Sequence, residues 1–98
     1  MASRRLRFNA LAEAELQDAA SWYDERVVGM GARFIAAIRH RANEILESPQ
    51  RWPVIRGVRR VLVGAYPYAI IYREISDDEV EIVAVAHLKR RQGYWAQR

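Results

Sequence analysis

Residues 79–95 read EVEIVAVAHLKRRQGYW. The first nine alternate in polarity and then become continuously apolar, which is the pattern of a central strand buried on both faces. The apolar run stops at His87, and the cations Lys89, Arg90 and Arg91 and a Gly-Tyr-Trp motif follow it. A rigid strand that ends in histidine, cationic and tyrosine side chains predicts a site for phosphate or nucleic-acid chemistry at its open end.

Three other segments are predicted to be strands. Tyr68 to Ile75 is rich in β-branched and aromatic residues, and Val58 to Val63 is a shorter strand-like run. Near the N-terminus, Leu6 and Phe8 alternate with arginines, as in a half-buried strand. The polar residues 76–78 favour a hairpin turn between the last two strands.

Two helices are predicted between the first strand and the others. Asn9 is a suitable N-cap, and apolar residues recur at helical spacing from Ala10 to Val27. The glycines of Gly29-Met30-Gly31 predict the end of this helix. A second apolar stripe predicts another helix, which ends near Glu47 because Pro49 disfavours helical backbone at the residue before it.

These elements predict one α+β domain over residues 1–98 with the order β-α-α-β-β-β. In this fold a helical hairpin packs on a small, mostly antiparallel sheet. No predicted element covers the opposite face of the sheet. That face is therefore predicted to be an open, basic binding surface.

The charge is distributed unevenly along the chain. Residues 1–48 contain seven arginines and seven acids, whereas residues 49–98 contain eight arginines, one lysine and five acids, so the net charge of +4 lies in the second half. A basic surface of this kind predicts an anionic partner, either nucleic acid or an acidic protein.

Composition excludes several other classes of protein. The chain has no cysteine and two histidines, so we expect no disulfide, no metal site and no cofactor. It has no apolar run of about 18 residues that would span a membrane. Residues 1–5 lack the apolar block of a signal peptide, and we expect a cytoplasmic protein.

Four groups of residues, in this order, carry a family resemblance. They are Trp22-Tyr23 before Gly29-Met30-Gly31 and Phe34; Pro49 with Trp52-Pro53; Arg60 before Tyr66-Pro67-Tyr68 and Ile71-Tyr72; and Ala84-Val85-Ala86-His87 before Arg90, Arg91 and Gly93-Tyr94-Trp95. From about Leu6 to Trp95 the chain resembles the RelE/ParE superfamily of toxins from type II toxin–antitoxin modules, and it is closer to the ParE-like members.

The resemblance implies a bacterial growth inhibitor that is neutralised by an antitoxin encoded beside it, in modules known for plasmid stabilisation. ParE-like toxins inhibit DNA gyrase, whereas RelE-like toxins bind the ribosome and cut mRNA. Under either activity, DNA is contacted only indirectly, through the antitoxin. The chain has a single lysine and a short spacing from Arg90 to Tyr94, and both differences from RelE-like toxins favour gyrase as the target.

A RelE-type enzyme would need an acid, a base and cations around the scissile phosphate. The predicted catalytic residues for that alternative are His87, Arg60, Arg90 and Tyr94. The further predicted binding residues are Arg59, Lys89, Arg91 and Trp95. Histidine suits proton transfer near neutral pH, arginine holds phosphate, and tyrosine stacks on a base or donates a proton.

Each of these residues also has a structural interpretation. His87 would hydrogen-bond the C-terminal segment, and residues 89–91 would form a solvated turn. Arg59 and Arg60 would pair with glutamates across the sheet. Trp95 would pack back on the sheet, and Trp22 and Tyr23 would be packing residues, with Tyr23 on the core stripe of its helix.

Overall fold

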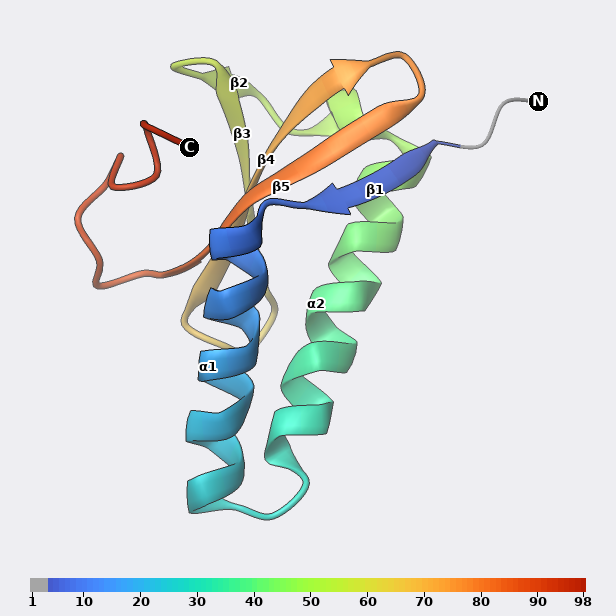
Figure 1. Cartoon of the computed structure of the whole chain (residues 1–98). Coiled ribbons are helices and arrows are strands. Elements are labelled where there is room, and N and C mark those ends of the chain that lie inside the picture. Colours follow the sequence, from blue (N-terminus) through green and yellow to red (C-terminus); the bar gives the residue numbers. More distant parts are fainter. Residues whose placement is uncertain (1–3) are drawn as a thin grey trace.

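The computed structural model describes residues 4–98 and shows two helices packed on one face of a five-stranded sheet (Figure 1). The strands are β1 (Arg5–Phe8), β2 (Val54–Ile55), β3 (Val58–Leu62), β4 (Tyr68–Ser76) and β5 (Glu79–His87). Their order in the sheet is β1-β5-β4-β3-β2, with β1 parallel to β5 and every other pair antiparallel. Met1 to Ser3, part of the segment examined for a signal peptide, lie outside the described residues.

The predicted α+β class and the central position of the last strand are confirmed, because β5 lies between β1 and β4. The structure adds two short elements to the predicted order: the strand β2 and a 3-10 helix, η1 (Pro49–Arg51). A strand of two residues is too short to show an alternating pattern. The 3-10 helix begins at Pro49, and β2 follows directly after Pro53.

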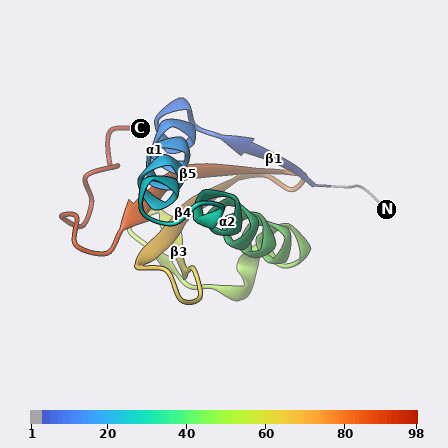
Figure 2. The same ribbon diagram turned by 90° about the horizontal axis from the view of Figure 1, so that it is seen from below.

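The helices are α1 (Ala10–Arg26) and α2 (Met30–Glu47), and they lie side by side against the sheet (Figure 2). The Asn9 side chain caps α1 by accepting a hydrogen bond from the backbone N–H of Leu11 at 2.8 Å. The link between the helices contains Gly29 with φ +87°, a conformation that glycine adopts without steric cost. Asp24 at the end of α1 then accepts the N–H of Gly31 at 2.7 Å, which ties the two helices together. Among residues 4–98, neither helix is long and apolar enough to cross a membrane.

The main core lies between the helices and the sheet. Its fully buried side chains include Phe34 and Ile38 from α2, and Ile70 and Tyr72 from β4. Each large apolar side chain buried in this way contributes about 1.5–3 kcal/mol. The hydroxyl of Tyr72 donates to the carbonyl of Pro49 at 2.6 Å, and burial raises the pKa of this tyrosine to about 12.

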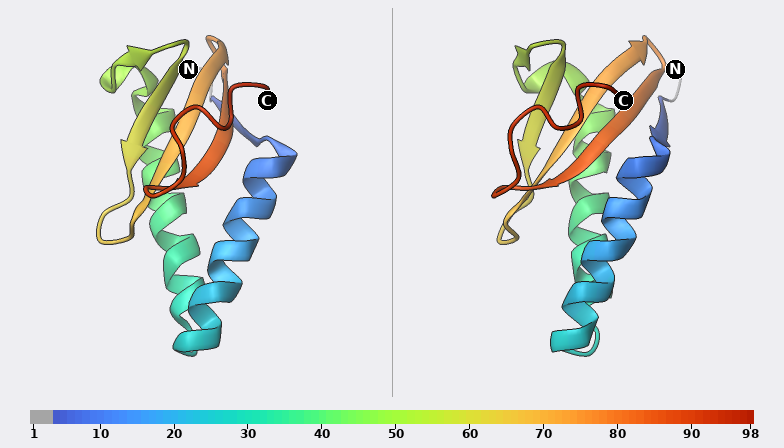
Figure 3. Two further views of the ribbon diagram at one scale, coloured as in Figure 1. Left: turned by 90° about the vertical axis from the view of Figure 1, so that its left-hand side faces the viewer. Right: turned by 60° about the vertical axis from the view of Figure 1, so that its left-hand side comes forward.

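The opposite face of the sheet is partly covered, so the expectation of a fully uncovered face was wrong. Residues 88–98 turn back after β5 and cross the face (Figure 3). Tyr94 and Trp95 from this segment pack over a second buried cluster that includes Ile71, Val83 and Ala86. A central strand that is apolar on both faces needs cover on both, and the C-terminal segment supplies part of it.

Candidate functional site

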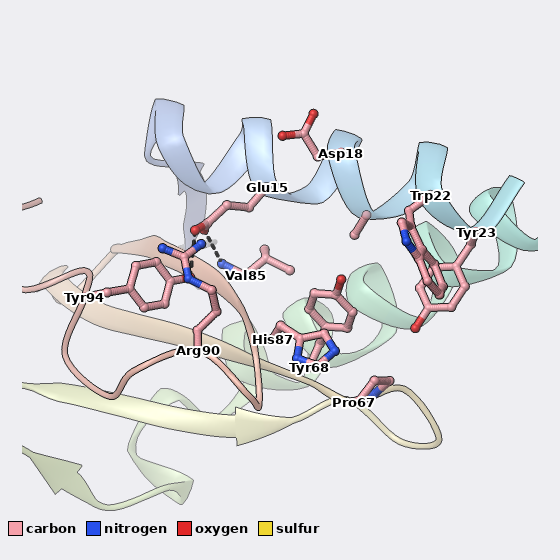
Figure 4. A pocket seen from close by; sticks show the side chains of 11 residues that line it. Glu15, Asp18, Trp22, Tyr23, Pro67, Tyr68, Val85, His87, Arg90 and Tyr94 are labelled. Atoms are coloured by element: carbon pink, nitrogen blue, oxygen red, sulfur yellow. Dashed lines mark hydrogen bonds between the residues drawn. The ribbon is translucent and has the colours of Figure 1, made fainter. Parts of the chain in front are cut away.

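A groove of about 440 Å³ lies between α1 and the C-terminal end of β5 (Figure 4). We call it the α1 groove. Helix α1 contributes Glu15, Trp22 and Tyr23, among others, and the C-terminal segment contributes Arg90 and Tyr94. The loop before β4, the start of β4 and the end of β5 form the remaining wall. Three of the predicted site residues therefore line one groove: His87, Arg90 and Tyr94.

Aromatic rings form much of this groove. The ring of His87 meets that of Tyr68 edge to face, with centroids 5.0 Å apart. Tyr23 packs on the main core, as predicted. Trp22 is 49% exposed, and the guanidinium of Arg26 lies 3.5 Å from the centre of its ring. Trp22 packs edge to face on Tyr23, with ring centroids 5.2 Å apart, and its exposed part lines the groove.

A cluster of hydrogen bonds around Glu15 fixes the C-terminal segment to α1. The Glu15 carboxylate accepts the hydroxyl of Tyr94 at 2.7 Å and two N–H groups of Arg98 at 2.9 and 3.0 Å. It also accepts the backbone N–H of Val85 at 3.0 Å, while Arg98 donates to the carbonyl of Val83 at 3.1 Å. We call this arrangement the Glu15 latch. It satisfies backbone groups of β5 that lie beyond the end of β1.

The latch sets the chemical state of its members. Burial, followed by the hydrogen bond to Glu15, raises the pKa of Tyr94 well above its usual range. The hydrogen bond to Glu15 raises the pKa of Arg98. The guanidinium of Arg90 lies 3.8 Å from the centre of the Tyr94 ring. Tyr94 is therefore a neutral hydrogen-bond donor with one face covered.

His87 and Lys89 stabilise the turn that follows β5. The Nδ1 of His87 accepts the backbone N–H of Lys89 at 3.0 Å, in agreement with the structural interpretation of this histidine. Lys89 lies in the exposed turn that follows β5. The imidazole of His87 thus has one nitrogen engaged and its ring against Tyr68.

A second groove, of about 810 Å³, lies on the opposite face of the sheet between the β2–β3 hairpin and the C-terminal segment. We call it the arginine groove. It is lined by five arginines, namely Arg56, Arg60, Arg73, Arg91 and Arg98, and by Trp95. Trp95 packs on the sheet, as its structural interpretation predicted.

The predicted catalytic set is divided between the two grooves. Arg60 lines the arginine groove, whereas His87, Arg90 and Tyr94 line the α1 groove. Arg59 lines neither groove and pairs with Glu74 across the sheet at 2.8 Å. The sequence analysis missed the roles of Glu15 and Arg98, and no spacing signal could have joined residues separated by 83 positions.

The sequence and the fold both resemble known proteins. A family model described as the ParE toxin of the type II toxin–antitoxin system, parDE, matches residues 6–92. A chain from the chromosomal ParDE system of P. aeruginosa superimposes with a TM-score of 0.74 and 16% identity. This match covers 87% of the present chain and 96% of that one, and at this identity it shows the fold alone. No curated protein matches the sequence.

Proposed function

The chain belongs to the ParE toxin family of type II toxin–antitoxin systems, and we propose that it arrests growth by binding DNA gyrase in the cytoplasm. The resemblance to ParE-like members motivates the choice of gyrase. The observation that carries the proposal is the division of the candidate catalytic residues between two grooves, with Tyr94 engaged in the Glu15 latch. Such an arrangement suits inhibition by binding better than it suits cleavage of RNA.

We propose the helical hairpin as the contact with gyrase. Its far end projects beyond the sheet (Figure 1). There Val28 is 97% exposed and Val27 is 53% exposed, and Trp22 lies about one turn before the end of α1. Exposed apolar and aromatic side chains at the end of a rigid support are suited to anchor an interface.

The proposal is tested with purified toxin, freed of antitoxin and shown to be folded by circular dichroism. DNA supercoiling by gyrase and the amount of trapped cleaved plasmid are both measured. We expect loss of supercoiling or accumulation of cleaved plasmid. Normal gyrase activity in the presence of folded toxin would refute the choice of target.

The contact surface is tested by Val28→Asp, with Ile75→Asp as the matched control. Ile75 is also an exposed apolar residue, 42% exposed, but it lies on β4. A carboxylate at the tip of the hairpin should weaken gyrase inhibition at least about tenfold, since an apolar contact would be lost and a charge buried. Equal inhibition by the two variants would move the contact away from the hairpin.

If gyrase is unaffected, ribosome-dependent cleavage of mRNA becomes the target activity to test. The His87→Ala variant then measures whether the histidine acts as acid or base. Under either target, we propose that the toxin is neutralised by the antitoxin encoded beside it and meets operator DNA only through that partner. Growth arrest relieved by an antitoxin also accounts for plasmid stabilisation by such modules.

A further inference from the structure

The arginine groove combines cationic walls with apolar lining. Its arginines come from three parts of the chain: Arg56 from the turn of the β2–β3 hairpin, Arg60 and Arg73 from β3 and β4, and Arg91 and Arg98 from the C-terminal segment that crosses this face of the sheet (Figure 3). The buried side chains of Ile71 and Val83 line the groove as well. Its volume of about 810 Å³ lies within the range of roughly 300–1,000 Å³ that is usual for small-molecule sites.

Much of the positive charge in this groove has no internal partner. Among residues 4–98, Arg56, Arg60 and Arg91 form no ion pair, and no carboxylate side chain lines the groove. All three arginines are exposed. Guanidinium groups bind phosphate oxygens through paired, charge-assisted hydrogen bonds. Three such groups around one groove match a compact ligand that carries two or three phosphate groups.

The two other arginines of the groove are held by glutamates. Arg73 pairs with the buried Glu81 at 2.7 Å, and Arg98 belongs to the Glu15 latch. Glu81 also pairs with Arg7, at 3.0 Å, so one carboxylate compensates two guanidinium groups. Because Arg73 and Arg98 are ordered before a ligand arrives, their part of the wall adds little to the entropy cost of binding.

We propose that the arginine groove binds a nucleoside diphosphate or triphosphate. The phosphate groups would lie between Arg60 on β3 and Arg91 on the C-terminal segment, within reach of Arg56. The planar base would rest against the apolar lining, which includes the partly buried indole of Trp95. The arginine groove is separate from the α1 groove and from the tip of the helical hairpin, so this inference goes beyond the proposed function and does not depend on gyrase.

A long nucleic-acid strand fits the same observations less well. Such a strand continues beyond any single groove and binds through cations along its path. On the hairpin side the surface is apolar instead, since Val54 and Ile55 are 56% and 60% exposed. A compact ligand meets arginines from the hairpin, the sheet and the C-terminal segment at once, without crossing this apolar surface.

The site is tested by calorimetric titration of the purified toxin, freed of antitoxin, with ATP and with GTP in the absence of divalent cations. AMP and inorganic tripolyphosphate are titrated for comparison. We expect the triphosphates to bind about tenfold more tightly than AMP, because a single phosphate reaches fewer arginines. They should also bind more tightly than tripolyphosphate, which has no base to place on the apolar lining.

The arginines are tested by Arg60→Gln and Arg91→Gln, with Arg39→Gln as the matched control. Arg39 is also an exposed arginine, but it lies on α2, on the other side of the sheet. The two groove variants should each bind ATP about tenfold more weakly, whereas the control should bind it unchanged. Circular dichroism verifies that all three variants are folded.

Hydrogen exchange distinguishes a ligand seated in the groove from a diffuse cloud of anions. The backbone N–H groups of Tyr94 and Ala96 donate within the C-terminal segment, at 3.4 and 3.0 Å. A ligand that bridges Arg91 and the sheet should hold this segment in place and slow exchange at both amides. Sulfate at the same ionic strength should leave the exchange unchanged.

Four results would overturn the inference. In the first, ATP and GTP at millimolar concentration give neither a heat of binding nor slower exchange. In the second, Arg60→Gln and Arg91→Gln bind ATP as tightly as Arg39→Gln. In the third, tripolyphosphate binds as tightly as ATP, which would exclude a nucleoside. In the fourth, a single-stranded oligonucleotide binds more tightly than ATP and loses this affinity in Arg60→Gln. Every measurement uses the toxin alone, so a failure of the gyrase proposal leaves this test valid.

Discussion

Replacing Glu15 by glutamine should release the C-terminal segment from α1. The change removes the negative charge that Arg98 and the Tyr94 hydroxyl bind, while the size and the polarity of the side chain are nearly conserved. The carboxylate also accepts the N–H of Val85, so the substitution weakens three kinds of contact at once. Glu13→Gln is the matched control, because Glu13 lies on the exposed side of α1 and, among residues 4–98, its side chain bonds only with Gln17, at 3.2 Å.

The size of the effect follows from burial. The side chains of Glu15 and Arg98 are 16% and 12% exposed, so water screens their pairing only weakly. Breaking a buried ion pair by removing one partner costs about 3–5 kcal/mol. A chain end can move out into water and recover part of this loss, and we therefore expect about 2–3 kcal/mol for Glu15→Gln. In a domain of this size, that loss lowers the Tm by roughly 10–20 °C.

Thermal and denaturant unfolding of the single and double variants measures this contribution. In a double-mutant cycle with Arg98→Met, the two substitutions should show a coupling of at least about 1 kcal/mol. Hydrogen exchange should also become faster at the amide of Val85 than at buried amides of β4. A coupling within about 0.5 kcal/mol of zero, or a Tm equal to that of Glu13→Gln, would refute the reasoning that the Glu15 latch holds the segment.

Further predictions concern the helical hairpin and the core. Gly31→Ala should destabilise the fold by about 2–3 kcal/mol in chemical denaturation, because the new methyl group would meet the backbone of α1 and the Asp24 carboxylate. Gly29→Ala, which meets no atom but has a positive φ, should cost only about 1 kcal/mol; a reversed order would contradict this packing argument. Burial raises the pKa of Tyr72 to about 12, so its contribution to stability is complete below pH about 10 and is lost as the pH rises toward 12. Tyr72→Phe should lose the hydrogen bond to Pro49, with a cost of about 1–2 kcal/mol at neutral pH, and should make stability less steep above pH 10; an unchanged alkaline slope would exclude this tyrosine as a contributor.

Most of the fold follows from local sequence signals. Asn9, the Gly29 break and Pro49 fix the ends of both helices, because caps and breakers act on their immediate neighbours. The strand β5 is recognisable from its continuous apolar run. The short strand β2 has no such signal, since two residues define no period and its pairing depends on the turn that joins it to β3.

The candidate site is harder to predict because its contacts join distant parts of the chain. From the sequence alone, Tyr94 has the features of a residue that binds nucleic acid. In the structure its hydroxyl instead donates to Glu15, which lies 79 positions earlier in the chain. The sequence places Glu15 only near the start of α1, where acids stabilise the helix dipole. His87, Arg60 and Tyr94 could be identified as polar groups at the ends and edges of strands, but not assigned to separate grooves, because the path of the last eleven residues determines which face each one meets.

Contacts between distant residues also decide which of the arginines can attract a partner. The uneven charge along the sequence correctly marks the second half, yet individual arginines there have different roles. Arg59 and Arg98 form ion pairs with glutamates at 2.8 and 2.9 Å, so their positive charge is compensated within the fold. Arg60 and Arg91 line the arginine groove without such a partner among residues 4–98. An acidic partner is attracted by the charge that the fold leaves uncompensated.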